Sequence, residues 1–277
     1  MRSLNYCLFA LLLSLTYACG SGETTADDPE TMDADPSATI SVQDRDSLRD
    51  LYHELMAAMD DTLPLNLIRE AGKLYPVDEA PKDTAFFIFR QQLIDAIDRR
   101  DVFALMDVIH PDIKVSFGGE GGVADFVSTW ELETPDKAQN SRVWSILKRV
   151  LVNGGIFENG GKTFIAPYIY AVWPDAHDAF EHVAITGSGV RLRSAPNLQS
   201  QTLTMVSYDV VKRLETTPKE ETIGGETHPW EKVQLLGEEG KEGYIYGKYI
   251  ASSIDYRAAF ERQPDGKWLM NFLVAGD

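Results

Sequence analysis

The apolar positions of this chain recur every three to four residues in its first half and alternate in much of its second half. The first half therefore predicts helices and the second half predicts strands. Ser47 is placed to cap a first helix that Pro64 ends, and Asp83 or Thr84 opens a second helix. The apolar positions of these two helices are Leu48, Leu51, Tyr52, Leu55, Met56 and Met59, followed by Phe86, Phe89, Leu93, Ile94 and Ile97.

Shorter elements are expected after the second helix. The apolar residues of 102–109 keep helical spacing as far as the sequence HPD at 110–112, and residues 113–117 alternate as in a strand. The glycines of 118–122 interrupt the chain before a further helix over 123–130. This order of helices and an isolated strand is typical of an α+β domain.

Two more segments complete the helix-rich region, which we place at residues 47–182. A helix is predicted over 141–152, where two glycines at 154–155 stop it. Residues 163–173 are rich in β-forming side chains, but Pro167 makes this segment bend or restricts it to a sheet edge.

The N-terminus carries the pattern of a secretory signal over residues 1–18. A single basic residue, Arg2, precedes an apolar run over residues 6–15, and small residues follow it. The run is too short to span a bilayer, which needs roughly 20 residues. The sequence LTYAC that ends at Cys19 resembles the lipobox of bacterial lipoproteins, although Thr16 stands where that family prefers leucine. The resemblance implies that Cys19 is lipidated and that the exported protein is anchored to a bacterial membrane, facing the periplasm or the outside.

The cysteine content agrees with this interpretation. Cys7 lies inside the predicted signal and Cys19 directly after it, and they are the two cysteines of the chain. The exported part therefore has neither a disulfide framework nor a cysteine nucleophile. Ordinary secretion, with Cys19 unmodified, is the alternative.

Charge sets the next limits on function. The formal net charge is −17, which argues against nucleic acid and anionic lipid as partners, because both require clustered positive charge. Residues 19–46 are rich in acidic, small and polar residues and cannot bury enough apolar surface to fold. We interpret this segment as an acidic disordered tether.

The sequence LIDAIDRRDVFALMDVIHPDIKVSFGG at 93–119 resembles the start of cone-shaped α+β domains of the nuclear-transport-factor-2 type. The resemblance rests on the order of helix, short helix and strand. It implies a fold that can hold a pocket, so a small-ligand-binding protein is one alternative function.

The second half of the chain predicts a small β-barrel. Alternation turns Val190 and Leu192 to one face of a strand and Arg191 and Arg193 to the other, and Pro196 ends the pairing because it lacks an N–H. A barrel of this size needs one large side chain in its core. We expect Trp230, flanked by Val233 and Leu235, to supply it.

Residues 183–251 resemble the bacterial SH3 (SH3b) domain element by element, although Ala195 replaces the usual glycine and the insertion ETTPKEETIGGETHP replaces a tight turn. The resemblance implies a module that binds peptide or cell-wall components, with Arg193 held by a local acid or carbonyl. An exposed aromatic groove on the barrel is expected to involve Tyr208, Tyr244 and Tyr246. The positions that match the family pattern are Val190, Leu192, Arg193, Ser194, Pro196, Trp230, Val233, Gly243, Tyr244, Tyr249 and Ile250.

The tail over 255–277 predicts a β-hairpin around the turn Pro264–Asp265–Gly266. Because a hairpin is not stable alone, we expect it to complete the sheet of the first domain and so to make the barrel an insertion. The alternative is packing on the barrel. The predicted pairs are Arg262 with Trp268, Phe260 with Met270, Ala258 with Phe272 and Tyr256 with Val274, with Leu269 and Leu273 off the apolar face.

Catalytic motifs are weak. The sequence HDAFEH at 177–182 has the spacing of neither zinc-protease signature, and no nucleophile elbow or phosphate loop is present. Glu120 and Asp125 are the one carboxylate pair that we weighed for a hydrolase. We therefore predict no catalytic residue, cofactor or metal. The expected partner is a cell-wall peptide or an envelope protein, and an envelope hydrolase is the third alternative.

Overall fold

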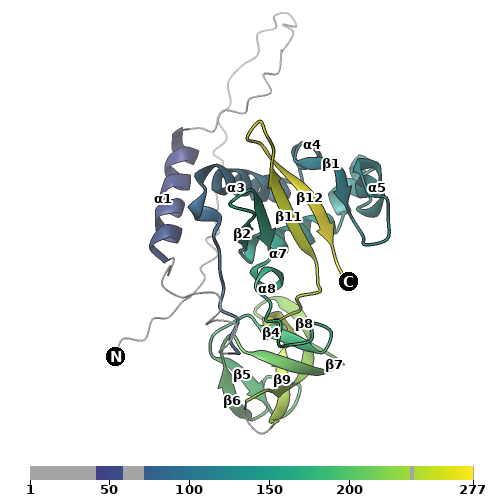
Figure 1. Cartoon of the computed structure of the whole chain (residues 1–277). Helices are drawn as coiled ribbons and strands as arrows, with labels where there is room; N and C mark the ends of the chain where they lie inside the picture. Colours follow the sequence, from purple (N-terminus) through teal and green to yellow (C-terminus); the bar gives the residue numbers. More distant parts are fainter. Residues whose placement is uncertain (1–41, 59–71, 238–239, 277) are drawn as a thin grey trace, which may run out of the picture. The chain divides into compact units, whose positions relative to one another are not determined.

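The computed structural model describes residues 42–58, 72–237 and 240–276 (Figure 1). The predicted signal, Cys19, most of the predicted tether, Met59 and Pro64 lie outside these residues. The described part has a mixed α+β fold, as predicted from the change of hydrophobic period, and it contains two sheets.

The first sheet has five strands in the order β1-β12-β11-β3-β2. Its strands come from two regions of the chain: β1 (Ile109–Lys114), β2 (Ile156–Glu158) and β3 (Thr163–Ala166) precede the second sheet, whereas β11 (Arg257–Arg262) and β12 (Trp268–Val274) follow it. β11 pairs antiparallel with both β12 and β3, and β12 pairs parallel with β1. The last strands of the chain therefore lie in the middle of this sheet.

The register of the C-terminal hairpin differs in part from the predicted one. Arg262 faces Trp268 and Phe260 faces Met270, but a register shift follows, so that Ala259 instead of Ala258 faces Phe272. The shift places one extra residue, Asn271, in β12, which is the effect of a β-bulge. As a result Leu273, predicted to lie off the apolar face, is fully buried in the core.

The helices begin and end close to the residues predicted from the sequence, but the structure corrects the prediction in three places. The helices are α1 (Val42–Ala58), α3 (Thr84–Arg99), α4 (Val102–Met106), α5 (Val123–Thr129), α6 (Pro135–Asn140), α7 (Val143–Val152) and α8 (Tyr168–Ala171), with a 3-10 turn η1 (Ala80–Lys82). Asp83 caps α3 by accepting a hydrogen bond from the Phe86 N–H at 2.9 Å.

The first correction concerns α1, which begins at Val42, so that Ser47 lies inside the helix and the end of the predicted tether is helical. Acidic residues near a helix N-terminus interact favourably with its dipole, and Asp46 lies in this part of α1.

The second correction concerns 109–112, predicted to end a helix. α4 stops at Met106, and these residues form most of β1. The third concerns 163–173: the strand β3 ends before the cis peptide Ala166–Pro167, and α8 follows instead of more strand.

The space between the first sheet and its helices is filled by aromatic side chains. Phe86 of α3 lies at the centre, with its ring centroid 4.2 Å from that of Phe164 and 4.8 Å from that of Trp268. Leu147 of α7 and Phe260 of β11 belong to the same buried cluster. This packing occupies the interior in which the cone-shaped resemblance would place a pocket.

The second sheet is curled and has seven strands in the order β10-β4-β7-β8-β9-β5-β6 (Figure 1). Its core consists of alternate residues of these strands, among them Val190, Leu192, Val233 and Ile245. The strands are β4 (His182–Ile185), β5 (Val190–Arg193), β6 (Thr202–Val206), β7 (Val210–Ile223), β8 (Glu226–Leu235), β9 (Glu242–Tyr246) and β10 (Ile250–Ala251), with a 3-10 turn η2 (Gly247–Tyr249).

Trp230 does not plug this core, contrary to the prediction. It is 1% exposed, but the core cluster of the second sheet does not include it. Val233 lies three positions after it on β8, and successive side chains of a strand point to opposite faces. Trp230 therefore lies on the other face of the sheet. There it is paired with Tyr246 of the neighbouring strand β9.

A short segment before α3 connects the two sheets. Lys73 forms an isolated β-bridge with Asp209, and its ammonium group makes an ion pair with the same residue at 2.5 Å. Leu74, fully buried, joins a small cluster with Tyr168 of α8 and Val210 of β7. The segment forms neither a helix nor a strand, yet it adds backbone pairing and apolar contacts to the second sheet.

Candidate functional site

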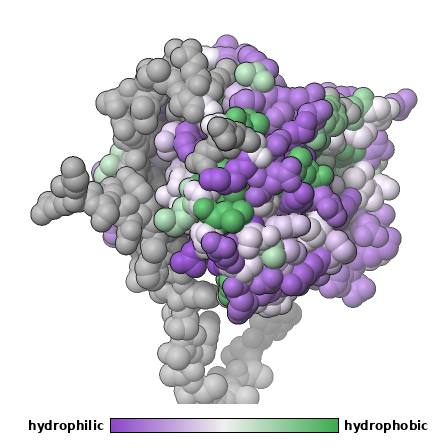
Figure 2. All heavy atoms as spheres, turned by 90° about the horizontal axis from the view of Figure 1, so that it is seen from below, coloured by the Kyte–Doolittle hydropathy of each residue, from purple (hydrophilic) through white to green (hydrophobic). Residues whose placement is uncertain are grey.

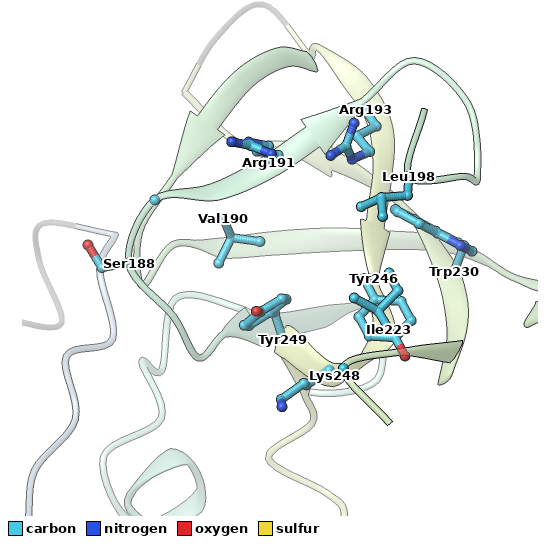
Figure 3. Close-up of a pocket in the computed structure, with 12 residues that line it drawn as sticks. Ser188, Val190, Arg191, Arg193, Leu198, Ile223, Trp230, Tyr246, Lys248 and Tyr249 are labelled. Carbon is cyan, nitrogen blue, oxygen red and sulfur yellow. The ribbon is translucent and has the colours of Figure 1, made fainter. Parts of the chain in front are cut away.

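A groove of about 400 Å³ lies on the second sheet (Figure 3). Its walls are β5, the tip of the long β7–β8 hairpin and the turn η2. It is lined by Ser188, Gly189, Val190, Arg191, Arg193, Leu198, Ile223, Gly224, Trp230, Tyr246, Lys248 and Tyr249. The volume lies within the range of small-ligand sites, about 300–1,000 Å³.

Two aromatic side chains in the groove are held by the hairpin tip. The rings of Trp230 and Tyr246 lie with centroids 5.6 Å apart. The indole N–H of Trp230 donates to the Glu221 carboxylate at 3.0 Å. The Tyr246 hydroxyl lies 2.9 Å from the carbonyl oxygen of Glu221 and 2.5 Å from that of Glu226. These bonds fix both rings, and because Trp230 and Tyr246 are almost fully buried they form a rigid floor beneath the groove before any ligand binds.

Three cationic side chains line the same groove, and two of them are already engaged. Arg193 is 6% exposed and donates from Nη1 to the carbonyl oxygen of Ser200 at 2.7 Å. Lys248 pairs with Glu226 at 2.8 Å, and the hydrogen bond that its ammonium group donates to this carboxylate raises the pKa of Lys248. Arg191 is exposed and forms no ion pair or hydrogen bond in the described part of the chain.

The ion pair with Lys248 also affects the protonation of its partner, Glu226. Hydrogen bonds from Lys248 and then from His228 lower the pKa of Glu226, so this carboxylate stays ionised well into mildly acidic solution. Charge at this end of the groove is therefore balanced locally, and Arg191 is the groove cation that remains available to a ligand.

The groove thus combines a preformed apolar surface with one available guanidinium. In Figure 3, Arg191 and Arg193 come from β5, whereas Lys248 and Tyr249 come from the opposite side of the groove. Seen from below, where Figure 1 shows the strands of the second sheet, the surface is mostly hydrophilic around a small hydrophobic cluster (Figure 2). This arrangement can bind a ligand through apolar contacts and through one contact between Arg191 and a carboxylate.

The structure separates the three tyrosines that were expected to share one groove. Tyr246 lines the groove but is largely buried. Tyr208 lies elsewhere, with its ring 5.4 Å from that of Tyr75, and it adopts a positive φ of 58°. Tyr244 faces Arg193 and Lys232 on neighbouring strands and does not line the groove.

The other positions of the sequence pattern divide between core and groove. Val190, Arg193, Trp230 and Tyr249 line the groove, whereas Leu192 and Val233 lie in the core. Pro196 follows β5 in the connection to β6. Gly243 allows a close approach, since a Cβ there would lie 2.6 Å from Leu192 Cγ and 2.8 Å from the Arg193 carbonyl oxygen.

Sequence reasoning missed Leu198, Ile223 and Lys248. Ile223 belongs to the insertion ETTPKEETIGGETHP, which was noted only as a departure from the family pattern. Its alternation and the GG pair at 224–225 were the available signals for a long hairpin. That hairpin forms one wall of the groove.

The other chemical candidates have structural roles. Asp125 accepts a hydrogen bond from the Gly121 N–H at 3.0 Å, and the backbone carbonyl of Glu120 accepts one from Lys114 at 2.6 Å. The rings of His177 and His182 lie 5.2 Å apart, and burial, then the second histidine, lowers the pKa of His177. Within the described ranges, no three metal-binding side chains gather, and no helix is long and apolar enough to span a membrane.

Comparison with known proteins adds no relative. No family model matches the chain, and no curated protein and no solved structure matches it significantly.

Proposed function

We propose that this protein is an exported bacterial lipoprotein, anchored through Cys19, whose SH3b-type barrel over 183–251 binds carboxylate-bearing peptide in the groove beside Trp230. The observation that carries the proposal is the combination of two locked aromatic rings with the available guanidinium of Arg191 in one groove. No reacting group is required for such a role.

Preorganisation supports binding at this site. Because the buried rings beneath the groove are already held by Glu221, a ligand does not have to order them, so less entropy is lost on association. Tyrosine and tryptophan side chains are also the groups that most often dominate binding energy at interfaces.

Charge supports a carboxylate as the polar contact. The chain as a whole carries −17, and a ligand with a negative group is repelled by most of its surface. The groove differs locally, because Arg191 is uncompensated there. Arginine forms paired, charge-assisted hydrogen bonds with carboxylates, which adds orientation to affinity.

The runner-up function, a small-ligand pocket inside the first domain, has less support. The aromatic cluster around Phe86 fills the space between α3 and the sheet, so a ligand would have to displace core side chains. No observation favours the third alternative, an envelope hydrolase. The carboxylate of Asp125 accepts a hydrogen bond from the backbone N–H of Gly121.

The test compares cell-wall peptide fragments with the same fragments after amidation of their carboxylates. The protein is the mature chain with Cys19→Ser, and binding is followed by calorimetry and by Trp230 fluorescence. We expect amidation to weaken binding about tenfold, because charge-assisted hydrogen bonds contribute about 1.5–3 kcal/mol. Arg191→Gln should weaken binding of the free acid equally and remove the difference between the two ligands.

Arg149→Gln is the matched control, because Arg149 is also exposed but pairs with Asp255 away from the groove. Equal binding of acid and amide by the wild-type protein would contradict the role of Arg191. Absence of binding to any wall fragment would contradict the proposed ligand class.

A further inference from the structure

A second arginine of the described chain lies in an unusual environment in the first sheet. Arg257, the first residue of β11, is 4% exposed. The carbon of its guanidinium lies 4.5 Å from the ring centroid of Tyr170 and 5.1 Å from that of Phe117. Both rings are themselves accessible, since Phe117 is 58% exposed and Tyr170 is 36% exposed.

The comparison with another buried arginine shows what Arg257 lacks. Arg90 is equally buried, and its two terminal nitrogens donate to the two carboxylate oxygens of Asp78 at 2.7 Å each. Arg257 makes no ion pair and no hydrogen bond with any described residue, and its Nη1 is buried without a partner. Among the acidic residues that the structure describes, none pairs with this guanidinium.

The two aromatic rings compensate the charge only in part. A ring attracts a cation through its quadrupole, but it does not satisfy the five N–H donors that a guanidinium directs outward in its plane. A buried donor without an acceptor costs free energy, and a buried charge costs more unless an opposite charge pairs with it. An acceptor with negative charge would remove both penalties together.

We propose that Arg257, with Phe117 and Tyr170, forms a binding site for an oxyanion, a carboxylate or a phosphate group. Two oxygens of such a group match the fork of the guanidinium. The rings contact the carbon part of the ligand. Phe117 lies just before the glycines of 118–122, and its exposure allows the side chain to turn aside without disturbing the core.

This site is separate from the groove. Arg257 belongs to the five-stranded sheet, and the groove is built on the seven-stranded sheet. The inference therefore does not depend on the proposed function, and a chain that binds no wall peptide can still bind an oxyanion here.

The test uses the mature chain with Cys19→Ser and follows the arginine Nε–H signals by NMR. Sodium acetate and sodium phosphate are titrated separately against sodium chloride at matched ionic strength. We expect a saturable shift of the Arg257 signal, identified by its loss in Arg257→Met, while the Arg90 signal stays unchanged. Whichever anion saturates at lower concentration distinguishes a carboxylate site from a phosphate site.

Variants separate recognition from packing. Arg257→Lys keeps the charge but loses the fork, and we expect it to bind the anion at least about tenfold more weakly. Phe117→Leu keeps an apolar side chain at an exposed position and should fold normally while weakening binding. The added anion should raise the melting temperature of the wild type and not that of Arg257→Met.

Two outcomes would overturn the inference. One is an Arg257 signal that neither anion moves beyond the effect of chloride. The other is an anion-dependent rise in melting temperature that persists in both Arg257→Met and Arg257→Lys. If Arg257→Met does not fold, the wild-type titration and Arg257→Lys still decide the question.

Discussion

Trp230 shows how one side chain can support a site without belonging to the main core. It is buried against Tyr246 and bonded to Glu221, and the hairpin tip that carries Glu221 forms a wall of the groove. Its removal should therefore affect both stability and binding, whereas removal of a residue from the core of the second sheet should affect stability alone.

We expect Trp230→Ala to lower the free energy of unfolding by about 3–5 kcal/mol, the usual cost of deleting a buried aromatic side chain. Denaturant unfolding of the mature chain measures it. Trp230→Phe keeps a ring but loses the bond to Glu221, so it should lose less. An unchanged midpoint for Trp230→Ala would mean that this side chain is not packed as described.

For individual residues, the sequence predicted some positions correctly. Asp83 was expected to open α3, and its side chain does accept the Phe86 N–H. Trp230 is buried, as expected, but its place in the barrel core was predicted wrongly: the prediction followed the need of a small barrel for one large core side chain and ignored the strand alternation that places Trp230 opposite Val233. The partners of Tyr246 were beyond prediction, because they lie on a hairpin tip that reaches the site only in three dimensions.

Among the elements, the β7–β8 hairpin has the clearest functional consequence. Its inner part pairs within the sheet, and its tip supplies Ile223 and Glu221 to the groove. The sheet core contains no residue of the tip. The hairpin therefore divides into a structural half and a half that serves the site.

Replacement of residues 221–228 by the two-residue turn Asn-Gly, between the paired residues Glu220 and Pro229, tests this division. We expect the shortened chain to keep cooperative unfolding but to lose ligand binding, because Trp230 and Tyr246 lose the acceptors that hold them. Trp fluorescence should shift to longer wavelength as Trp230 becomes solvated. Retention of full affinity would exclude the hairpin tip from the site.

Elements with a clear hydrophobic period were the ones that the sequence could locate. α6 was missed, although Thr134 caps it with a hydrogen bond from Lys137 and Pro135 stands at its first position. β2 was missed because three residues give no period to detect. β1 was displaced because residues 102–109 keep helical spacing into the strand.

For the molecule as a whole, the anchor at Cys19 is the part of the proposal that needs its own measurement. Cells fed a clickable fatty acid should label the wild-type protein and not Cys19→Ser, because acylation requires the thiol. The variant should appear in the soluble exported fraction, since one anchored cysteine accounts for membrane retention. Equal labelling of both proteins, or a free thiol at the mature N-terminus by mass spectrometry, would contradict lipidation.

The position of the last two strands has a consequence for when the protein can fold. β11 and β12 lie in the middle of the first sheet, so β1 cannot pair with β12, nor β3 with β11, until the final residues of the chain are available. Pairing over such sequence distances is slow. The proposed export would gain from this delay, because the first sheet cannot be completed while the C-terminus is still being delivered.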